Sequence, residues 1–195
     1  MNNFIKISCA IVLLLIIGCD QSYSPKPRGY FRIDLPEKTY IRLSENLPYS
    51  FEYPAYANIT PDYNSPGETS WINVEFPGFN GSLHISYKAV NNDLNNFIED
   101  SRALVQKHIP KANAIRESLI MNESKRVFGL VYEIDGKGAA SPMQFYVTDS
   151  TTHFLRGALY FNVRPNNDSL APVIDFLKAD IQHLINTLEW QPALN

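Results

Sequence analysis

The chain has 195 residues and a formal net charge of −3, from 17 Lys and Arg against 20 Asp and Glu. Nucleic-acid-binding domains are usually strongly basic, so this charge argues against a nucleic-acid partner. A chain of this length buries roughly 70% of its unfolded surface, which is sufficient for a single hydrophobic core.

Residues 1–18 have the three parts of a bacterial export signal: a positive region with Lys6, a short apolar run, and a small residue before the expected cleavage point. The run is shorter than the about 20 residues that a membrane-spanning helix needs. Ile16-Ile17-Gly18-Cys19 resembles a lipobox, in which the cysteine becomes a lipidated N-terminus. We therefore expect Cys19 to carry acyl chains such as palmitate and to anchor the chain to a membrane. The alternative is a simple signal peptide with an incidental cysteine.

Residues 19–39 are predicted to form a lipidated tether, because three prolines in this segment favour extended backbone over helix. The tether concentrates residue types that often anchor protein interfaces, namely Arg28, Tyr30, Phe31 and Arg32. We interpret these four residues as a hypothetical partner-binding arm.

Residues 40–195 are predicted to form a single α+β domain. Short strands are expected at 40–43, 49–53, 70–76 and 82–89, and a long loop at 60–69. Apolar residues at helical spacing predict a helix from Asn92 or Asp93 to Pro110. Four further strands are expected at 114–121, 126–135, 142–148 and 153–163, followed by a helix that begins at Asp168 and has a long apolar stripe. This order indicates a twisted antiparallel sheet packed with two helices.

In the late strands, Tyr146, Arg156 and Tyr160 share one face of the expected sheet. Such a half-polar, aromatic face has the composition of a protein-binding surface. The alternative is that the second helix covers this face.

No convincing catalytic or metal-binding pattern is present. The four histidines share no metal-ligand spacing, and we expect His84 and His183 to be solvated. The pair Ser101 and His108 and the group Asp149, Ser150 and His153 lack the sequence context of a nucleophile. Acylation of Cys19 would leave the mature chain without a free thiol, because Cys9 lies in the signal peptide. The prediction is a protein that is not an enzyme, with no cofactor, metal or small-molecule substrate.

Two resemblances extend this interpretation. The phrase from Pro48 to Pro54, the strand with Trp71 and the element order resemble the Mog1/PsbP-like sandwich. The segment from Pro25 to Tyr40, which includes Gly-Tyr-Phe-Arg-Ile-Asp-Leu-Pro, resembles the GldD family of gliding motility lipoproteins of the Bacteroidota.

The GldD resemblance implies a non-enzymatic envelope lipoprotein that acts in gliding motility and in type IX protein secretion as an assembly or scaffold component. Its partners would be the membrane, through the lipid, and other proteins of the gliding and secretion machinery. We expect a periplasm-facing location; the inner and the outer membrane both stay open, with the outer favoured. The alternative function is a periplasmic small-ligand-binding lipoprotein.

Overall fold

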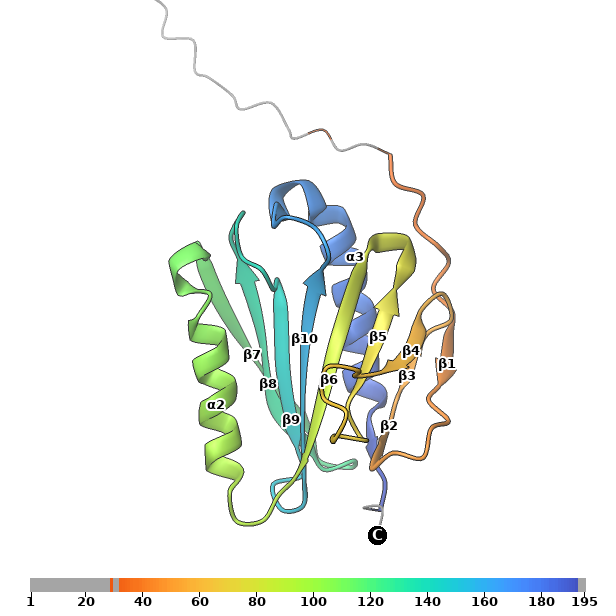
Figure 1. Ribbon diagram of the computed structural model, residues 1–195, viewed down its shortest axis with the longest axis vertical. Helices are drawn as coiled ribbons and strands as arrows, with labels where there is room; N and C mark the ends of the chain where they lie inside the picture. The colour runs from red at the N-terminus through yellow and green to blue at the C-terminus, as the bar shows by residue number, and fades with distance from the viewer. Residues whose placement is uncertain (1–28, 30–31, 193–195) are drawn as a thin grey trace, which may run out of the picture. The chain divides into compact units, whose positions relative to one another are not determined.

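The computed structural model of the chain describes residue 29 and residues 32–192. Its main feature is an antiparallel sheet of seven strands in the order β4-β5-β6-β10-β9-β8-β7 (Figure 1). The strands are β4 (Asn58–Pro61), β5 (Ile72–Phe76), β6 (Gly81–Ala89), β7 (Ala114–Asn122), β8 (Val127–Asp135), β9 (Met143–Thr148) and β10 (His153–Phe161). Together with two helices, this sheet confirms the predicted α+β class.

The helices α2 (Leu94–Gln106) and α3 (Asn167–Thr187) cover opposite faces of the main sheet. Neighbouring residues of a strand point to opposite faces. On β9, Val147 joins a core cluster with Leu177 of α3, whereas Tyr146 joins a separate cluster with Val105 of α2. The apolar stripe predicted for the terminal helix is buried except at Leu170, which is half-buried.

Two small antiparallel pairs complete the domain. β1 (Tyr40–Arg42) pairs with β3 (Glu52–Pro54), and β2 (Tyr49–Ser50) pairs with β11 (Glu189–Trp190). Short 3-10 turns lie at η1 (Pro77–Phe79) and η2 (Ile109–Lys111). The β3 strand lies along α3, so the first and the last segments of the domain pack together.

Three local predictions are corrected. Residues 58–61 form the edge strand β4 through pairing with β5, although part of this segment was expected to be loop. Residues 189–190 form a strand that was not expected. The His183 ring is not freely solvated, because it stacks on Tyr40 at 3.7 Å between ring centroids and its Nε2 lies 2.7 Å from a carboxylate oxygen of Glu52.

Candidate functional site

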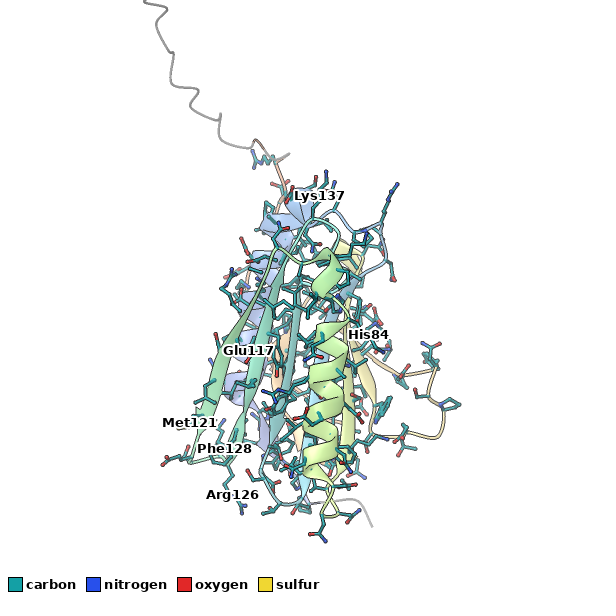
Figure 2. All side chains as sticks on the ribbon, turned by 90° about the vertical axis from the view of Figure 1, so that its left-hand side faces the viewer. His84, Glu117, Met121, Arg126, Phe128 and Lys137 are labelled. Atoms are coloured by element: carbon teal, nitrogen blue, oxygen red, sulfur yellow. The ribbon has the colours of Figure 1, made fainter. Side chains whose placement is uncertain are left out.

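The helix α2 covers only part of its side of the main sheet. Its buried contact layer comes from β8, β9 and the start of β10, with Tyr132, Tyr146 and Phe154 as members. Among the described residues, none from β5 or β6 belongs to that cluster, and the side chain of His84 on β6 is exposed; Figure 2, which looks onto α2, labels this residue to one side of the helix. We name the polar side chains on this part of the sheet the open face; they are Asn73, Glu75, Ser82, His84, Ser86, Lys88, Arg156 and Tyr160, of which Asn73 and Ser82 are buried and the others are exposed or half-buried.

Cross-strand hydrogen bonds hold the side chains of the open face in place. The His84 Nδ1 and the Asn73 Oδ1 lie 2.6 Å apart, and the His84 ring lies against that of Tyr160, with 5.6 Å between centroids. The Ser82 hydroxyl donates to Glu75. Because these neighbours fix one another, the open face presents an ordered polar surface on a rigid sheet.

Arg156 joins the open face to the end of α2 through a short polar relay. Its Nη2 donates to Oε1 of Gln144 at 2.6 Å, and Nε2 of Gln144 donates to Nε2 of His108 at 2.9 Å. Burial and the positive charge of Arg156 lower the pKa of His108. A neutral His108 is also what the relay requires, since its Nε2 must accept the amide proton. The relay thus couples the protonation of His108 to the position of Arg156.

The three residues that were predicted to share a binding face, Tyr146, Arg156 and Tyr160, differ in how exposed they are in the structure. Arg156 and Tyr160 are half-buried members of the open face. Tyr146 lies directly opposite Arg156 in the sheet, as expected for residues sharing a face. Its ring, however, is 7% exposed and stacks on Phe154 beneath α2, with 5.7 Å between centroids. The ring of Tyr146 therefore contributes to the packing of α2, and it is the helix over residues 94–106, not the terminal helix, that covers it.

The predicted N-terminal site residues lie mostly outside the described part of the chain. Cys19, Arg28, Tyr30 and Phe31 all precede residue 32 and have no described position. Arg32 is described, and its exposed side chain forms an ion pair with Asp34 at 3.1 Å. The lipidation of Cys19 and the binding role of this arm stay predictions.

The side chains that were weighed above as possible catalytic groups form hydrogen bonds and ring contacts with other parts of the structure. The buried Ser101 hydroxyl donates to the carbonyl of Phe97 within α2, at 2.9 Å. The Asp149 carboxylate accepts the backbone N–H groups of residues 151, 152 and 153. The His153 ring contacts the Tyr87 hydroxyl at 2.8 Å through Nδ1, and it stacks on Trp190. These contacts give Asp149 and His153 structural roles in the β9–β10 turn.

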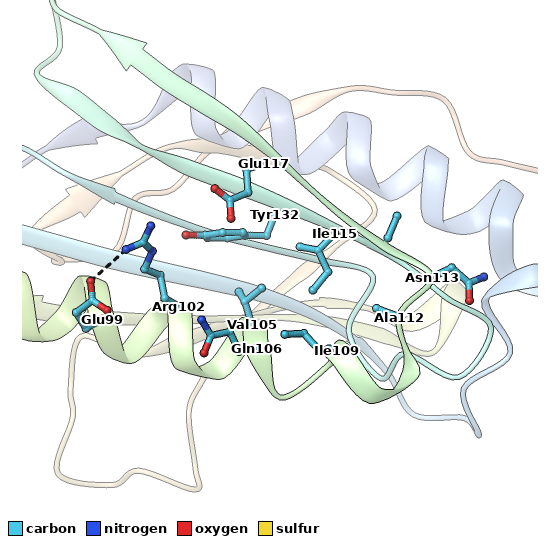
Figure 3. Close-up of a pocket in the computed structure, with 11 residues that line it drawn as sticks. Glu99, Arg102, Val105, Gln106, Ile109, Ala112, Asn113, Ile115, Glu117 and Tyr132 are labelled. Carbon is cyan, nitrogen blue, oxygen red and sulfur yellow. Dashed lines mark hydrogen bonds and ion pairs between the residues drawn. The ribbon is translucent and has the colours of Figure 1, made fainter.

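The sequence reasoning missed a cleft between α2 and the β7–β8 edge of the sheet, with a volume of about 630 Å³ (Figure 3). Arg102, Val105 and Gln106 of α2 form one wall, and Ile115 and Glu117 of β7 with Tyr132 of β8 form the other. The alternation of β7 and β8 does place Glu117 and Tyr132 on one face. The gap itself depends on where α2 lies, which no periodicity specifies.

Tyr132 is the unusual residue of this cleft. Its side chain is 1% exposed, and its hydroxyl lies near the Arg102 guanidinium without a well-aligned hydrogen bond to it or to any other described residue. Burial is the main cause of its raised pKa, with contributions from Tyr146 and Glu117 that Arg102 opposes. The phenol is therefore neutral and able both to donate and to accept a hydrogen bond.

Residues 29 and 32–192 contain no cluster of three or more His, Cys, Asp or Glu side chains that could hold a metal ion. In the same part of the chain, no helix combines the length and the apolar character needed to cross a membrane.

The comparison with protein families agrees with the GldD resemblance. The family model described as gliding motility lipoprotein GldD matches residues 20–190. No match is found among curated proteins. Among solved structures, the chain is similar to the solution structure of cyanobacterial PsbP (CyanoP) from Synechocystis sp. PCC 6803, with 10% sequence identity and a TM-score of 0.46. That similarity covers 86% of this chain and 99% of the other.

Proposed function

Because the chain belongs to the gliding motility lipoprotein GldD family, we propose that it is a non-enzymatic, membrane-anchored component of the cell envelope that helps to assemble the gliding machinery. Its role would extend to the associated type IX protein secretion. The acyl chains on Cys19 would hold it on the membrane, facing the periplasm, with the outer membrane favoured.

The observation that carries the scaffold role is the open face. Exposed sheet faces with Arg and Tyr side chains have the residue types that are enriched in protein interfaces. His84 is exposed at its centre, and Arg156 and Tyr160 flank it from β10. The side chains are already ordered by their own hydrogen bonds, so a partner would meet little entropic cost on binding. We propose that another protein of the gliding machinery docks here.

The alternative, a periplasmic small-ligand-binding lipoprotein, would use the cleft between α2 and β7. The cleft offers apolar walls and a few polar groups, as ligand sites commonly do. One wall, however, belongs to the terminal strand of the sheet, which is a feature of peptide-binding surfaces. The cleft therefore supports a different occupant, argued in the next subsection.

Complementation of a deletion strain tests the proposal. One variant carries His84→Glu and Ser86→Glu, which add two negative charges to the open face. The matched control carries Gln182→Glu and Asn186→Glu, which add the same charge to exposed positions of α3. We expect gliding and adhesin secretion to be lost only in the open-face variant, with equal protein levels and melting temperatures. Full complementation by the open-face variant would refute docking at this face, and loss in both would point to a general charge effect.

A further inference from the structure

We infer that the cleft between α2 and β7 is a second binding site, for an extended peptide that pairs with β7 as an additional strand and inserts a Lys or Arg side chain beside Glu117 and Tyr132. The site is separate from the open face. It does not depend on the proposed function.

The first step of the argument is the free edge of β7. This nine-residue strand ends the sheet and pairs with β8 on one side, and no other strand pairs with it among the described residues. Its register with β8 is unbroken from Ala114 to Asn122, so no bulge disrupts it. A long regular edge presents unpaired backbone N–H and C=O groups, which can bind an extended chain.

The protection that natural edge strands commonly carry is also weak here. Lysine and proline often block such edges, and β7 contains neither. Its one basic residue, Arg116, is engaged with Glu133 and Asp135. Leu119 and Met121 are instead exposed large apolar side chains on this strand, at 68% and 63%. The edge is thus open to a partner strand and has apolar contacts to offer it.

The second step concerns the side chains that a paired peptide would place in the cleft. Alternate residues of an added strand point to the same face as Glu117 and Tyr132, which lie directly opposite each other in the sheet. Figure 3 shows the Glu117 carboxylate and the Arg102 guanidinium near the hydroxyl end of the Tyr132 ring. Because the Tyr132 hydroxyl is buried and has no well-aligned hydrogen bond among the described residues, a ligand atom that hydrogen-bonds to it would lower an existing desolvation cost.

The charges of the cleft select a cation. Arg102 forms an ion pair with Glu99, at 3.2 Å, and its charge also attracts the more distant Glu117, so a single cation faces two carboxylates in the lining of the cleft. The unbalanced charge is therefore negative. An ammonium or guanidinium group can donate to both the Glu117 carboxylate and the Tyr132 oxygen. The apolar side chains of Val105 and Ile115 can cover the methylene stem of the same residue.

Peptide binding to the full-length protein in an uncharged detergent tests this inference. The probe is a labelled nine-residue peptide with alternating Val and Lys, capped at both ends and followed by fluorescence anisotropy. We expect saturable binding that Glu117→Lys weakens about tenfold or more, because a charged hydrogen bond is replaced by repulsion. Glu123→Lys, the same charge change in the exposed β7–β8 turn, should alter the affinity by less than about twofold.

Two further measurements separate strand pairing from general electrostatic attraction. A peptide with Glu in place of Lys should bind the Glu117→Lys variant better than it binds the unmodified protein. Tyr132→Phe should weaken binding of the lysine peptide while leaving the melting temperature unchanged or higher, since it removes a buried hydroxyl that has no well-aligned hydrogen bond among the described residues.

Four results would overturn the inference. The first is that Glu117→Lys and Glu123→Lys weaken peptide binding equally. The second is that a peptide with its lysines grouped at one end binds as tightly as the alternating peptide. The third is that no peptide binding is detected up to about 1 mM. The fourth is a homodimer in light scattering that Glu117→Lys dissociates, because a second copy would then occupy the β7 edge.

Discussion

The Tyr40 hydroxyl of β1 donates a hydrogen bond of 2.7 Å to the Asp180 carboxylate of α3, although 140 positions separate the two residues. Lys38 donates to the same carboxylate oxygen at 2.6 Å, and Tyr56 donates to the other oxygen. Asp180 is 1% exposed. Burial, together with the hydrogen bond to Asp180, raises the pKa of Tyr40 to about 12. This cluster fastens the end of the expected lipid tether, at Lys38, and the strand that follows it to the last helix of the domain.

Asp180→Asn should therefore destabilise the domain by about 2 to 4 kcal/mol, because it replaces the buried carboxylate that accepts hydrogen bonds from Lys38, Tyr40 and Tyr56 with a neutral amide that has only one acceptor oxygen. Asp175→Asn makes the same chemical change at an exposed position of α3 and should have an effect below about 0.5 kcal/mol. Urea unfolding of both variants measures the difference. Equal stability of the two would show that the Asp180 cluster does not hold the N-terminal segment.

Stability should fall as the pH is lowered through the range in which histidine titrates. Burial is the main cause of the lowered pKa of both His108 and His153; Arg156 lowers that of His108 further, and Asp149 opposes the shift at His153. A folded-state pKa below the unfolded value of about 6.5 means that the unfolded chain binds more protons, so stability rises with pH in this window. We expect the slope of unfolding free energy against pH to flatten in His108→Gln and in His153→Gln. An unchanged slope in both variants would show that His108 and His153 are not the groups that cause the loss of stability at low pH.

Asp149 should contribute stability that disappears in acid. Burial alone would raise its pKa, but the hydrogen bonds from the backbone N–H groups of residues 153, 152 and 151 outweigh this effect and lower it from 3.8 to about 2. Its folded pKa lies below its unfolded pKa, so the contribution is complete above about pH 4 and is lost as the pH falls towards 2. Asp149→Ala should cost about 2 to 3 kcal/mol at neutral pH, and the difference from the unmodified protein should shrink in acid. A difference that does not change with pH would assign the effect to packing.

The N-terminal arm should matter for partners more than for folding. Replacing Arg28, Tyr30 and Arg32 together by Ala should change stability by less than about 1 kcal/mol, as surface substitutions usually do. The one described member, Arg32, is exposed and pairs only with its neighbour Asp34 among the described contacts. The variant should nevertheless fail to restore adhesin secretion or gliding in a deletion strain. If the variant unfolds, the arm is part of the folded domain. If the variant folds and fully complements the deletion strain, the arm does not bind a partner that these functions need.

The sequence predicted the elements whose pattern is local. Alternation along residues 82–89 and helical spacing along residues 170–188 correspond to β6 and α3, because each pattern repeats at the period of its structure. β4 was missed because Pro61 and the absence of alternation hide a strand that depends on pairing with β5.

The candidate sites could not be predicted in full, because they are formed by residues far apart in the sequence and hydrophobic periodicity gives no information on such contacts. Strand parity correctly placed Tyr146 and Arg156 on one face, but it could not say that α2 covers Tyr146 and leaves His84 open. The buried Asp180 looks like one more polar helix residue until Lys38 and Tyr40 are brought to it from the far end of the chain. The cleft beside Tyr132 was missed for the same reason.

Site-specific photocrosslinking in gliding cells tests the proposed docking most directly. A photoreactive amino acid at position 84 lies on the open face, and one at position 182 lies on an exposed side of α3. We predict a discrete adduct with one envelope protein from position 84 only, and its loss when Ser86→Glu is added beside the crosslinker. Failure to form an adduct from position 84, or formation of the same adducts from both positions, would contradict a docking role for the open face.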